Sequence, residues 1–162
     1  MKFKISCLLF IQNQRNEILL LERKKTPNKG YWSPPGGKLK MEIGESPFEC
    51  ACREAKEETG LELKFSDLKL FGYVSEKNYE GNSHWLMFLF ESLQTIDCKP
   101  KDFDEGSYEF FSRQEIDKIK IPPSDSKLVW PFFDRRHEGF FGVNADCSQS
   151  EPKIRIEADP NL

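Results

Sequence analysis

Two short apolar runs with a polar stretch between them open the chain. KISCLLFI (residues 4–11) and EILLLER (residues 17–23) are separated by QNQRN. Apolar, branched runs joined by a few polar residues are typical of a β-hairpin. We therefore predict that the chain begins with two strands paired as a hairpin.

Three further apolar runs follow in the middle of the chain. LELKF (61–65), KLFGYVSE (69–76) and SHWLMFLFES (83–92) each predict a strand. The last is apolar on both faces, which favours a central place in a sheet. Near the end, KIRIE (153–157) is consistent with either a closing strand or a frayed tail.

Residues 46–60 carry the start and stop signals of a helix. Ser46, Pro47 and Glu49 suit its N-cap, its first position and an S-x-x-E capping box, and Gly60 suits its end. Shorter helices are predicted within EGSYEFFSRQEIDKI (105–119) and from residue 126 to about residue 135. This order of elements predicts an α+β sandwich with a mixed β-sheet, in which residues 1–145 form one domain and 146–162 a C-terminal tail.

Composition narrows the range of partners. The chain has 162 residues, a formal net charge of −3 and 31% charged residues, which argues against binding of nucleic-acid polymers. Five cysteines without a CxxC pair favour a reducing cytoplasm over a disulfide framework. The run CLLFI is too short to span a membrane, so we expect no membrane association. The many aromatic residues are compatible with a homo-oligomer.

The helix gathers three carboxylates on one narrow face. At about 3.6 residues per turn, Glu54, Glu57 and Glu58 lie together. The neighbouring arc predicts the core side, with Phe48, Ala51, Cys52 and Ala55. In one interpretation the carboxylates are a solvated face and Arg53 pairs with Glu49 and Glu57.

In the other interpretation no lysine or arginine lies within the carboxylates' arc, so their repulsion is relieved by a divalent cation. Carboxylate oxygens suit Mg²⁺ or Mn²⁺, with substrate phosphates completing the coordination. Gly36 and Gly37 lack side chains, so backbone there can approach a metal or a phosphate closely. The carboxylates and the glycines together predict a metal-dependent phosphate site.

The pattern GG…GE…REAKEETGL resembles the signature of the Nudix hydrolase family. From Glu45 onward the residues fall in register, namely Glu45, Arg53, Glu54, Glu57, Glu58, Gly60 and Leu61. The segment KLKMEIG between Gly37 and Glu45 is two residues longer than is usual in the family.

The resemblance implies an α/β/α sandwich and Mg²⁺-dependent hydrolysis of a nucleoside diphosphate linked to another group, with Mn²⁺ as a substitute. The favoured substrate is a nucleoside triphosphate, oxidised purines included, cut to monophosphate and pyrophosphate as in MutT-like enzymes. The alternatives are a nucleotide-sugar or dinucleotide pyrophosphatase, and a non-catalytic module that senses a nucleotide.

The resemblance also implies roles for individual residues. The metal ligands would be Glu54, Glu57, Glu58 and the carbonyl of Gly36. One of these glutamates would help to activate water, Arg53 would orient the carboxylates, and Glu45 would brace Arg53.

Three further residues complete the expected site. Glu105 resembles a later acidic residue that joins the metal or acts as base, with an ordinary loop carboxylate as the alternative. Arg23 resembles a phosphate-contacting position, whereas we expect Lys24 and Lys25 to lie in solvent. Asp125, in PPSDSKLV, either contacts the base or caps a helix. An ionised Asp125 would accept hydrogen bonds from donor groups of the base, as on guanine.

Overall fold

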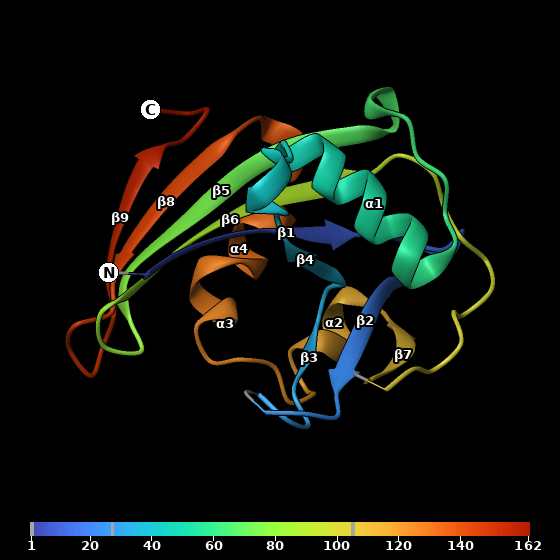
Figure 1. Cartoon of the computed structure of the whole chain (residues 1–162), viewed down its shortest axis with the longest axis horizontal. Coiled ribbons are helices and arrows are strands. Elements are labelled where there is room, and N and C mark those ends of the chain that lie inside the picture. Colours follow the sequence, from blue (N-terminus) through green and yellow to red (C-terminus); the bar gives the residue numbers. More distant parts are fainter. Residues whose placement is uncertain (1, 27, 105) are drawn as a thin grey trace.

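A six-stranded mixed sheet lies between helices on both of its faces (Figure 1). The computed structural model describes residues 2–26, 28–104 and 106–162. The strands of this sheet follow the order β4 (Gly36–Lys38), β1 (Lys2–Phe10), β6 (Ser83–Ser92), β5 (Leu68–Tyr79), β8 (Phe141–Asp146) and β9 (Lys153–Ala158). A smaller sheet consists of β3 (Trp32–Ser33), β2 (Ile18–Arg23) and β7 (Gly106–Phe111).

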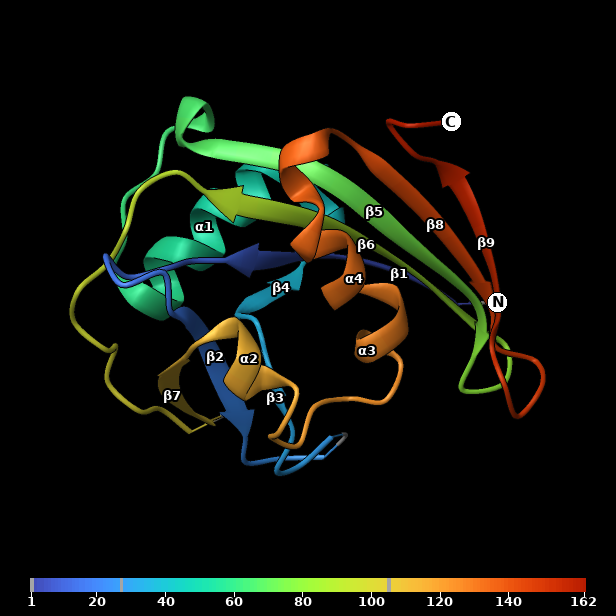
Figure 2. The same cartoon turned by 180° about the vertical axis from the view of Figure 1, so that it is seen from behind.

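The helices form two layers. Helix α1 (Pro47–Thr59) covers one face of the large sheet, and the view from behind shows α3 (Asp125–Leu128) and α4 (Trp130–Asp134) on the other (Figure 2). A further short helix, α2 (Arg113–Ile116), follows β7, and three 3₁₀ turns are η1 (Met41–Ile43), η2 (Phe65–Asp67) and η3 (Arg136–Glu138). Because β1 pairs with β6 and β5 with β8 in parallel while the other pairs are antiparallel, the predicted α+β sandwich with a mixed sheet is confirmed.

The predicted opening hairpin forms only around its turn, where Gln12 and Ile18 make an antiparallel bridge. A turn does join the two strands, since the Leu19 N–H donates to the Ile11 carbonyl at 2.9 Å. Beyond it the strands separate, and β1 pairs with β4 and β6 whereas β2 pairs with β3 and β7. Both strands are apolar on both faces, so each needs its own neighbours and contributes to both cores.

Side-chain alternation along β1 divides the core in two. Cys7 and Leu9 belong to the cluster beneath α1, while Phe10 belongs to the cluster beneath α3 and α4. Successive side chains of a strand point to opposite faces of its sheet, which accounts for this division. Phe10 stacks on Phe133 of α4 with ring centroids 4.9 Å apart.

Helix α1 begins and ends where its sequence predicts. The Ser46 hydroxyl accepts from the Glu49 N–H at 3.1 Å, and the Glu49 carboxylate accepts from the Ser46 N–H at 2.8 Å. Gly60, with φ of 76°, donates its N–H to Lys56. The fully buried residues of α1 are Cys50, Ala51 and Ala55, and Cys52 is partly buried and packs against the same core cluster. Cys52 therefore faces the core as predicted, whereas the prediction that Cys50 points elsewhere is wrong.

Three other segments test the sequence pattern. The predicted strand LELKF is wrong, since the chain is irregular from Leu61 to residue 64 and then enters η2. Its apolar residues Leu61 and Leu63 pack against the cluster beneath α1. The single helix predicted after residue 126 is two helices, broken at Val129 ahead of Pro131, which lacks an N–H. KIRIE lies in β9, which pairs with β8, so it is a strand and not a frayed tail.

Within the described residues, no helix is long and apolar enough to cross a membrane.

Candidate active site

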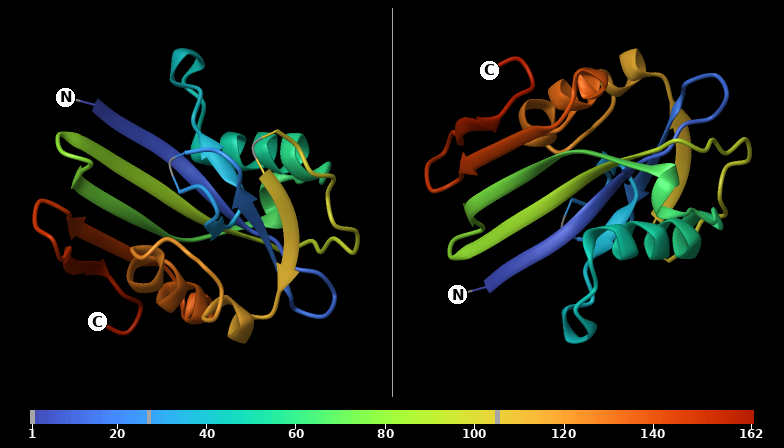
Figure 3. Two further views of the ribbon diagram at one scale, coloured as in Figure 1. Left: turned by 90° about the horizontal axis from the view of Figure 1, so that it is seen from below. Right: turned by 90° about the horizontal axis from the view of Figure 1, so that it is seen from above.

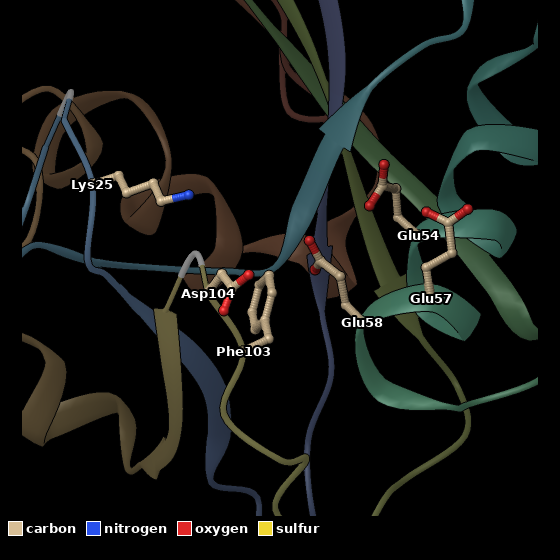
Figure 4. A pocket seen from close by; sticks show the side chains of 6 residues that line it. All are labelled: Lys25, Glu54, Glu57, Glu58, Phe103 and Asp104. Carbon is tan, nitrogen blue, oxygen red and sulfur yellow. The ribbon is translucent and has the colours of Figure 1, made fainter.

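A cavity of about 650 Å³ lies beside the carboxylate face of α1. Figure 4 shows the three glutamates of α1 on one wall and the segment before β7 facing them, with Lys25 extending from the chain after β2. The lining residues are Lys25, Glu54, Glu57, Glu58, Phe103 and Asp104. Three distant parts of the chain therefore meet around one polar cavity.

Backbone of β4 reaches the glutamates directly. The Gly36 N–H donates to Glu58 Oε2 at 3.2 Å. A side chain at Gly37 would overlap the carboxyl group of Glu54, and one at Gly36 would overlap the backbone carbonyl of Cys7 on β1. Both glycines are thus required by close approach, one to a functional carboxylate and the other to the neighbouring strand.

Gly37→Ala should separate activity from stability. We expect a loss of turnover of about tenfold or more with little change in melting temperature, because the added methyl group displaces only the Glu54 side chain. Gly36→Ala is the matched control and should lower the melting temperature, since its methyl group meets backbone that cannot turn away. Measurements of kcat and thermal unfolding on both variants check this, and undiminished turnover in Gly37→Ala would contradict it.

Arg53 connects the carboxylates. Its Nε and Nη2 donate to Glu45 at 2.6 and 2.9 Å, and its Nη1 donates to Glu54 at 2.8 Å and to Glu57 at 3.1 Å. The side chains of Arg53 and Glu45 are only 19% and 4% exposed. Hydrogen bonding to Arg53 lowers the pKa of Glu45 to about 2, and the pKa of Arg53 is raised in return. Arg53 therefore stays charged and holds two of the three glutamates.

These contacts bear on both interpretations of the helix, the solvated face with Arg53 ion pairs and the site for a divalent cation. Arg53 does pair with Glu57, but Glu49 binds the helix N-terminus instead. The expectation that no lysine or arginine relieves the repulsion of the glutamates is wrong, because the long Arg53 side chain reaches Glu54 and Glu57. Burial nevertheless raises the pKa of Glu54, an effect that Arg53 opposes.

The donors around the cavity fit a hard divalent cation in their chemistry. Among the described residues, no three acidic, cysteine or histidine side chains converge as a metal-binding group. Glu54 and Glu57 are turned toward Arg53, and Glu58 accepts from Gly36. Rotation about their side-chain bonds would turn these oxygens into the cavity that all three line. Carboxylates with adjacent backbone are the ligands that Mg²⁺ and Mn²⁺ prefer.

The long loop before α1 bulges away from the site. Figure 3 shows the segment with η1 projecting from the body, and Ile43 is 70% exposed. At the loop's base the Lys40 N–H donates to Glu45 Oε2 at 2.8 Å. The additional length is therefore accommodated outside the site, while the loop's closing residue still fixes Glu45.

The cavity includes residues that sequence reasoning did not select. Arg23, the predicted phosphate contact, ends β2 with an exposed side chain and does not line the cavity. Lys25, predicted to lie in solvent, does line it, as do Phe103 and Asp104. The acidic segment DFDEG contains Phe103 and Asp104, and its acidic residues could have indicated that it lines the cavity. Glu105, the residue predicted from this segment, lies outside the described residues.

Asp125 is the first residue of α3 and is not among the residues that line the cavity. Ser124 is the N-cap residue and makes no side-chain cap hydrogen bond, so the structure gives no support to the capping alternative. Although Asp125 is only partly buried as a residue, desolvation of its carboxyl group and then the charge of Glu76 raise its pKa to about 7. Glu76 on β5 is buried, its own pKa is raised by burial, and it accepts from the Cys147 thiol at 3.7 Å. Near neutral pH Asp125 is therefore partly protonated, which corrects the assumption of a purely ionised acceptor.

Comparison with known proteins places this geometry in context. The model of the NUDIX domain matches residues 2–130. An uncharacterized Nudix hydrolase of Bacillus subtilis, YvcI, is 30% identical over 115 residues, covering 70% of either chain. An ADP-ribose pyrophosphatase of Methanocaldococcus jannaschii is 36% identical over 105 residues, which are 64% of this chain and 59% of that protein. The solved structure of a MutT mutator protein from Bacillus halodurans has a TM-score of 0.74 at 26% identity, covering 97% of this chain and 99% of that one.

Proposed function

Since the chain belongs to the Nudix family of hydrolases, which cleave nucleoside diphosphate derivatives, we propose that it hydrolyses a nucleoside triphosphate to the monophosphate and pyrophosphate with Mg²⁺. Mn²⁺ substitutes, and oxidised purine nucleotides are among the substrates. The observation that carries the proposal is the cavity in which Glu54, Glu57 and Glu58 stand beside the backbone of β4. The similarity in fold to a MutT protein supports the choice of a triphosphate.

The glutamates and Gly36 have distinct tasks in this proposal. The carboxylates of Glu54, Glu57 and Glu58, with the Gly36 carbonyl, hold the divalent ion. When bound, Mg²⁺ supplies neutralisation of charge on the diphosphate oxygens and a lowered pKa of water. A glutamate carboxylate accepts the proton of the attacking water. Arg53 keeps Glu54 and Glu57 oriented through its hydrogen bonds to both.

Lys25 contributes the positive charge on the side of the cavity away from α1. Its ammonium group faces the cavity from the segment after β2, opposite the glutamates (Figure 4). Phosphate groups bound between the two walls would meet carboxylates on one side and this cation on the other. We therefore assign Lys25, and not Arg23, the contact to the phosphate chain.

Lys25→Ala is expected to raise KM about tenfold with little change in kcat. A hydrogen bond to a charged group contributes about 1.5–3 kcal/mol, and about 1.4 kcal/mol corresponds to a factor of ten. Lys24→Ala is the matched control, because Lys24 is a neighbouring exposed lysine that does not line the cavity. Steady-state kinetics on both variants check the assignment, and equal effects would show that only the overall charge matters.

A second substrate class has its own support. The relative from Methanocaldococcus jannaschii is an ADP-ribose pyrophosphatase, so a nucleotide-sugar substrate is the alternative for this chain. Phosphorus-31 NMR separates the two. A triphosphate would yield nucleoside monophosphate and pyrophosphate, whereas ADP-ribose would yield AMP and ribose 5-phosphate. The substrate with the higher kcat/KM in one panel with Mg²⁺ identifies the class.

We further propose that Asp125 reads the base, with Glu76 behind it. As a protonated acid Asp125 donates a hydrogen bond, and as a carboxylate it only accepts. With its pKa near 7, the order of preference among purine, oxidised-purine and pyrimidine triphosphates should change between about pH 6 and about pH 8. In Asp125→Asn this order should stay constant over the same range. A pH-independent order in the wild type would exclude Asp125 as a base reader.

The same group has an effect on stability that needs no substrate. A carboxyl group with a raised folded pKa holds its proton longer when folded, so its contribution to stability falls as pH rises from about 4 to about 7. Asp125→Asn removes this loss and should unfold at higher temperature than the wild type above pH 7. Thermal unfolding at several pH values measures the difference, and identical pH profiles would contradict the raised pKa.

A further inference from the structure

Two buried thiols meet directly beneath the catalytic helix. Cys7 on β1 and Cys50 on α1 place their sulfur atoms 3.3 Å apart, and neither residue is exposed. The contact joins β1, the strand next to the edge strand β4, to the first half of the helix that carries the glutamates. The two cysteines lie 43 residues apart in the sequence, so no local sequence motif predicts their contact.

The thiol pair is also connected to the site itself. The Cys50 thiol donates to the Gly37 carbonyl at 3.6 Å, and Arg53 Nη2 donates to the Cys50 sulfur at 3.8 Å. Cys7 is the pairing partner of Gly37 across β1 and β4. A change at the sulfur atoms therefore acts on Gly37, which abuts Glu54, and on Arg53, which orients Glu54 and Glu57.

We propose that Cys7 and Cys50 are a redox modification site, in which a hydroperoxide oxidises the thiols to a disulfide that lowers the activity of the neighbouring site. The Cys50 sulfur attacks the peroxide O–O bond as a thiolate, because the hydrogen bond with Cys50 and burial raise the pKa of Cys7. The attack forms a sulfenic acid, and the departing oxygen takes up the thiol proton and leaves as an alcohol, or as water from hydrogen peroxide. The second sulfur then attacks the sulfenic acid and releases water. Two thiols and one hydroperoxide thus give one disulfide, one alcohol and one water.

The bond changes local geometry by a small and definite amount. A disulfide holds its sulfur atoms about 2.05 Å apart, so the pair must close by more than an ångström from 3.3 Å. Cys50 also loses the hydrogen that it donates to Gly37. Displacements of about 1 Å in groups that position a catalytic site can reduce rates about a hundredfold.

Access to the sulfur atoms is restricted. Both lie between α1 and the sheet, so the oxidant reaches them when the helix lifts locally from the sheet. The other cysteines differ in their surroundings. Cys52 and Cys147 are partly buried and Cys98 is exposed. Exposed Cys98 is therefore modified first, and the internal disulfide follows more slowly.

The test uses the whole protein, treated with hydrogen peroxide and mapped by mass spectrometry of unreduced peptides. We expect a peptide pair joined through Cys7 and Cys50, activity reduced about tenfold or more, and full recovery with dithiothreitol. The disulfide should raise the melting temperature by on the order of 10 °C, since it closes a long loop in the unfolded chain. The peptide map and the melting temperature can be measured without a substrate, so these two results do not depend on the proposed function.

Cys50→Ala and Cys52→Ala form a matched pair two positions apart on the same helix. Peroxide should leave the activity of Cys50→Ala unchanged, whereas Cys52→Ala should still be inhibited. Should Cys50→Ala not fold, the wild-type map and its reversal by dithiothreitol decide alone. Modification of Cys98 without any joined Cys7 and Cys50 peptides would overturn the proposal, as would a joined pair with undiminished activity.

Discussion

Glu57→Gln and Glu58→Gln are each expected to lower turnover by about a hundredfold or more while the protein stays folded. Both side chains line the cavity from α1, and neither belongs to a buried core cluster. Glutamine keeps the size of the side chain and removes the negative charge that a divalent cation requires. The fold should tolerate this change, because the loss of one like charge also reduces repulsion on the helix face.

Turnover at limiting Mg²⁺, with circular dichroism to verify folding, measures this effect. Glu62→Gln is the control, since Glu62 is exposed, pairs with the exposed Lys56 and does not line the cavity. Part of the lost activity should return at high Mg²⁺. Near-normal turnover of both variants at limiting Mg²⁺ would contradict the assignment of Glu57 and Glu58 as metal ligands.

Glu45→Gln should damage stability and activity together. Glu45 and Arg53 form a pair that is almost excluded from solvent, and removal of one partner of a buried pair costs about 3–5 kcal/mol in free energy of unfolding. Because Arg53 is partly exposed, we expect the lower end of that range. Arg53 would then orient Glu54 less well, and turnover should fall about tenfold. Glu138→Gln breaks an exposed Arg–Glu pair and should lower the free energy of unfolding much less, because solvent screens the charges of such a pair.

The acid limb of the stability curve reports on the same pair. A carboxyl group with a lowered folded pKa contributes stability that is present above its ordinary pKa of about 4.5 and is lost as pH falls toward about 2. In Glu45→Gln that part of the acid-induced loss should be absent. Urea unfolding between about pH 2 and about pH 6 measures both curves, and parallel curves would contradict the role given to Glu45.

Local rules of the chain predicted α1 and its neighbourhood well. The capping box of Ser46 and Glu49 and the stop at Gly60 depend on contacts a few residues apart, which the sequence displays directly. The shared face of the glutamates follows from helix periodicity alone. The resemblance carried by residues 45–61 then pointed to the family that the comparisons support.

Contacts between distant residues were the ones that sequence reasoning missed. The divergence of β1 and β2 depends on which strands flank them, and hydrophobic runs do not specify partners. Lys25 lines the cavity only because the chain after β2 lies opposite the glutamates of α1. Likewise, helix periodicity alone leaves Cys50 outside the predicted apolar arc, and its burial depends on its contacts with Cys7 of β1 and Gly37 of β4.

Phosphorus-31 NMR of a nucleoside triphosphate incubated with the protein and Mg²⁺ shows whether the protein hydrolyses this substrate class. The expected products are nucleoside monophosphate and pyrophosphate, formed only with Mg²⁺ or Mn²⁺ and at least about a hundredfold more slowly by Glu58→Gln. Failure to consume any triphosphate or nucleotide-sugar with either ion at micromolar protein would contradict the proposed function, as would equal rates for Glu58→Gln and the wild type.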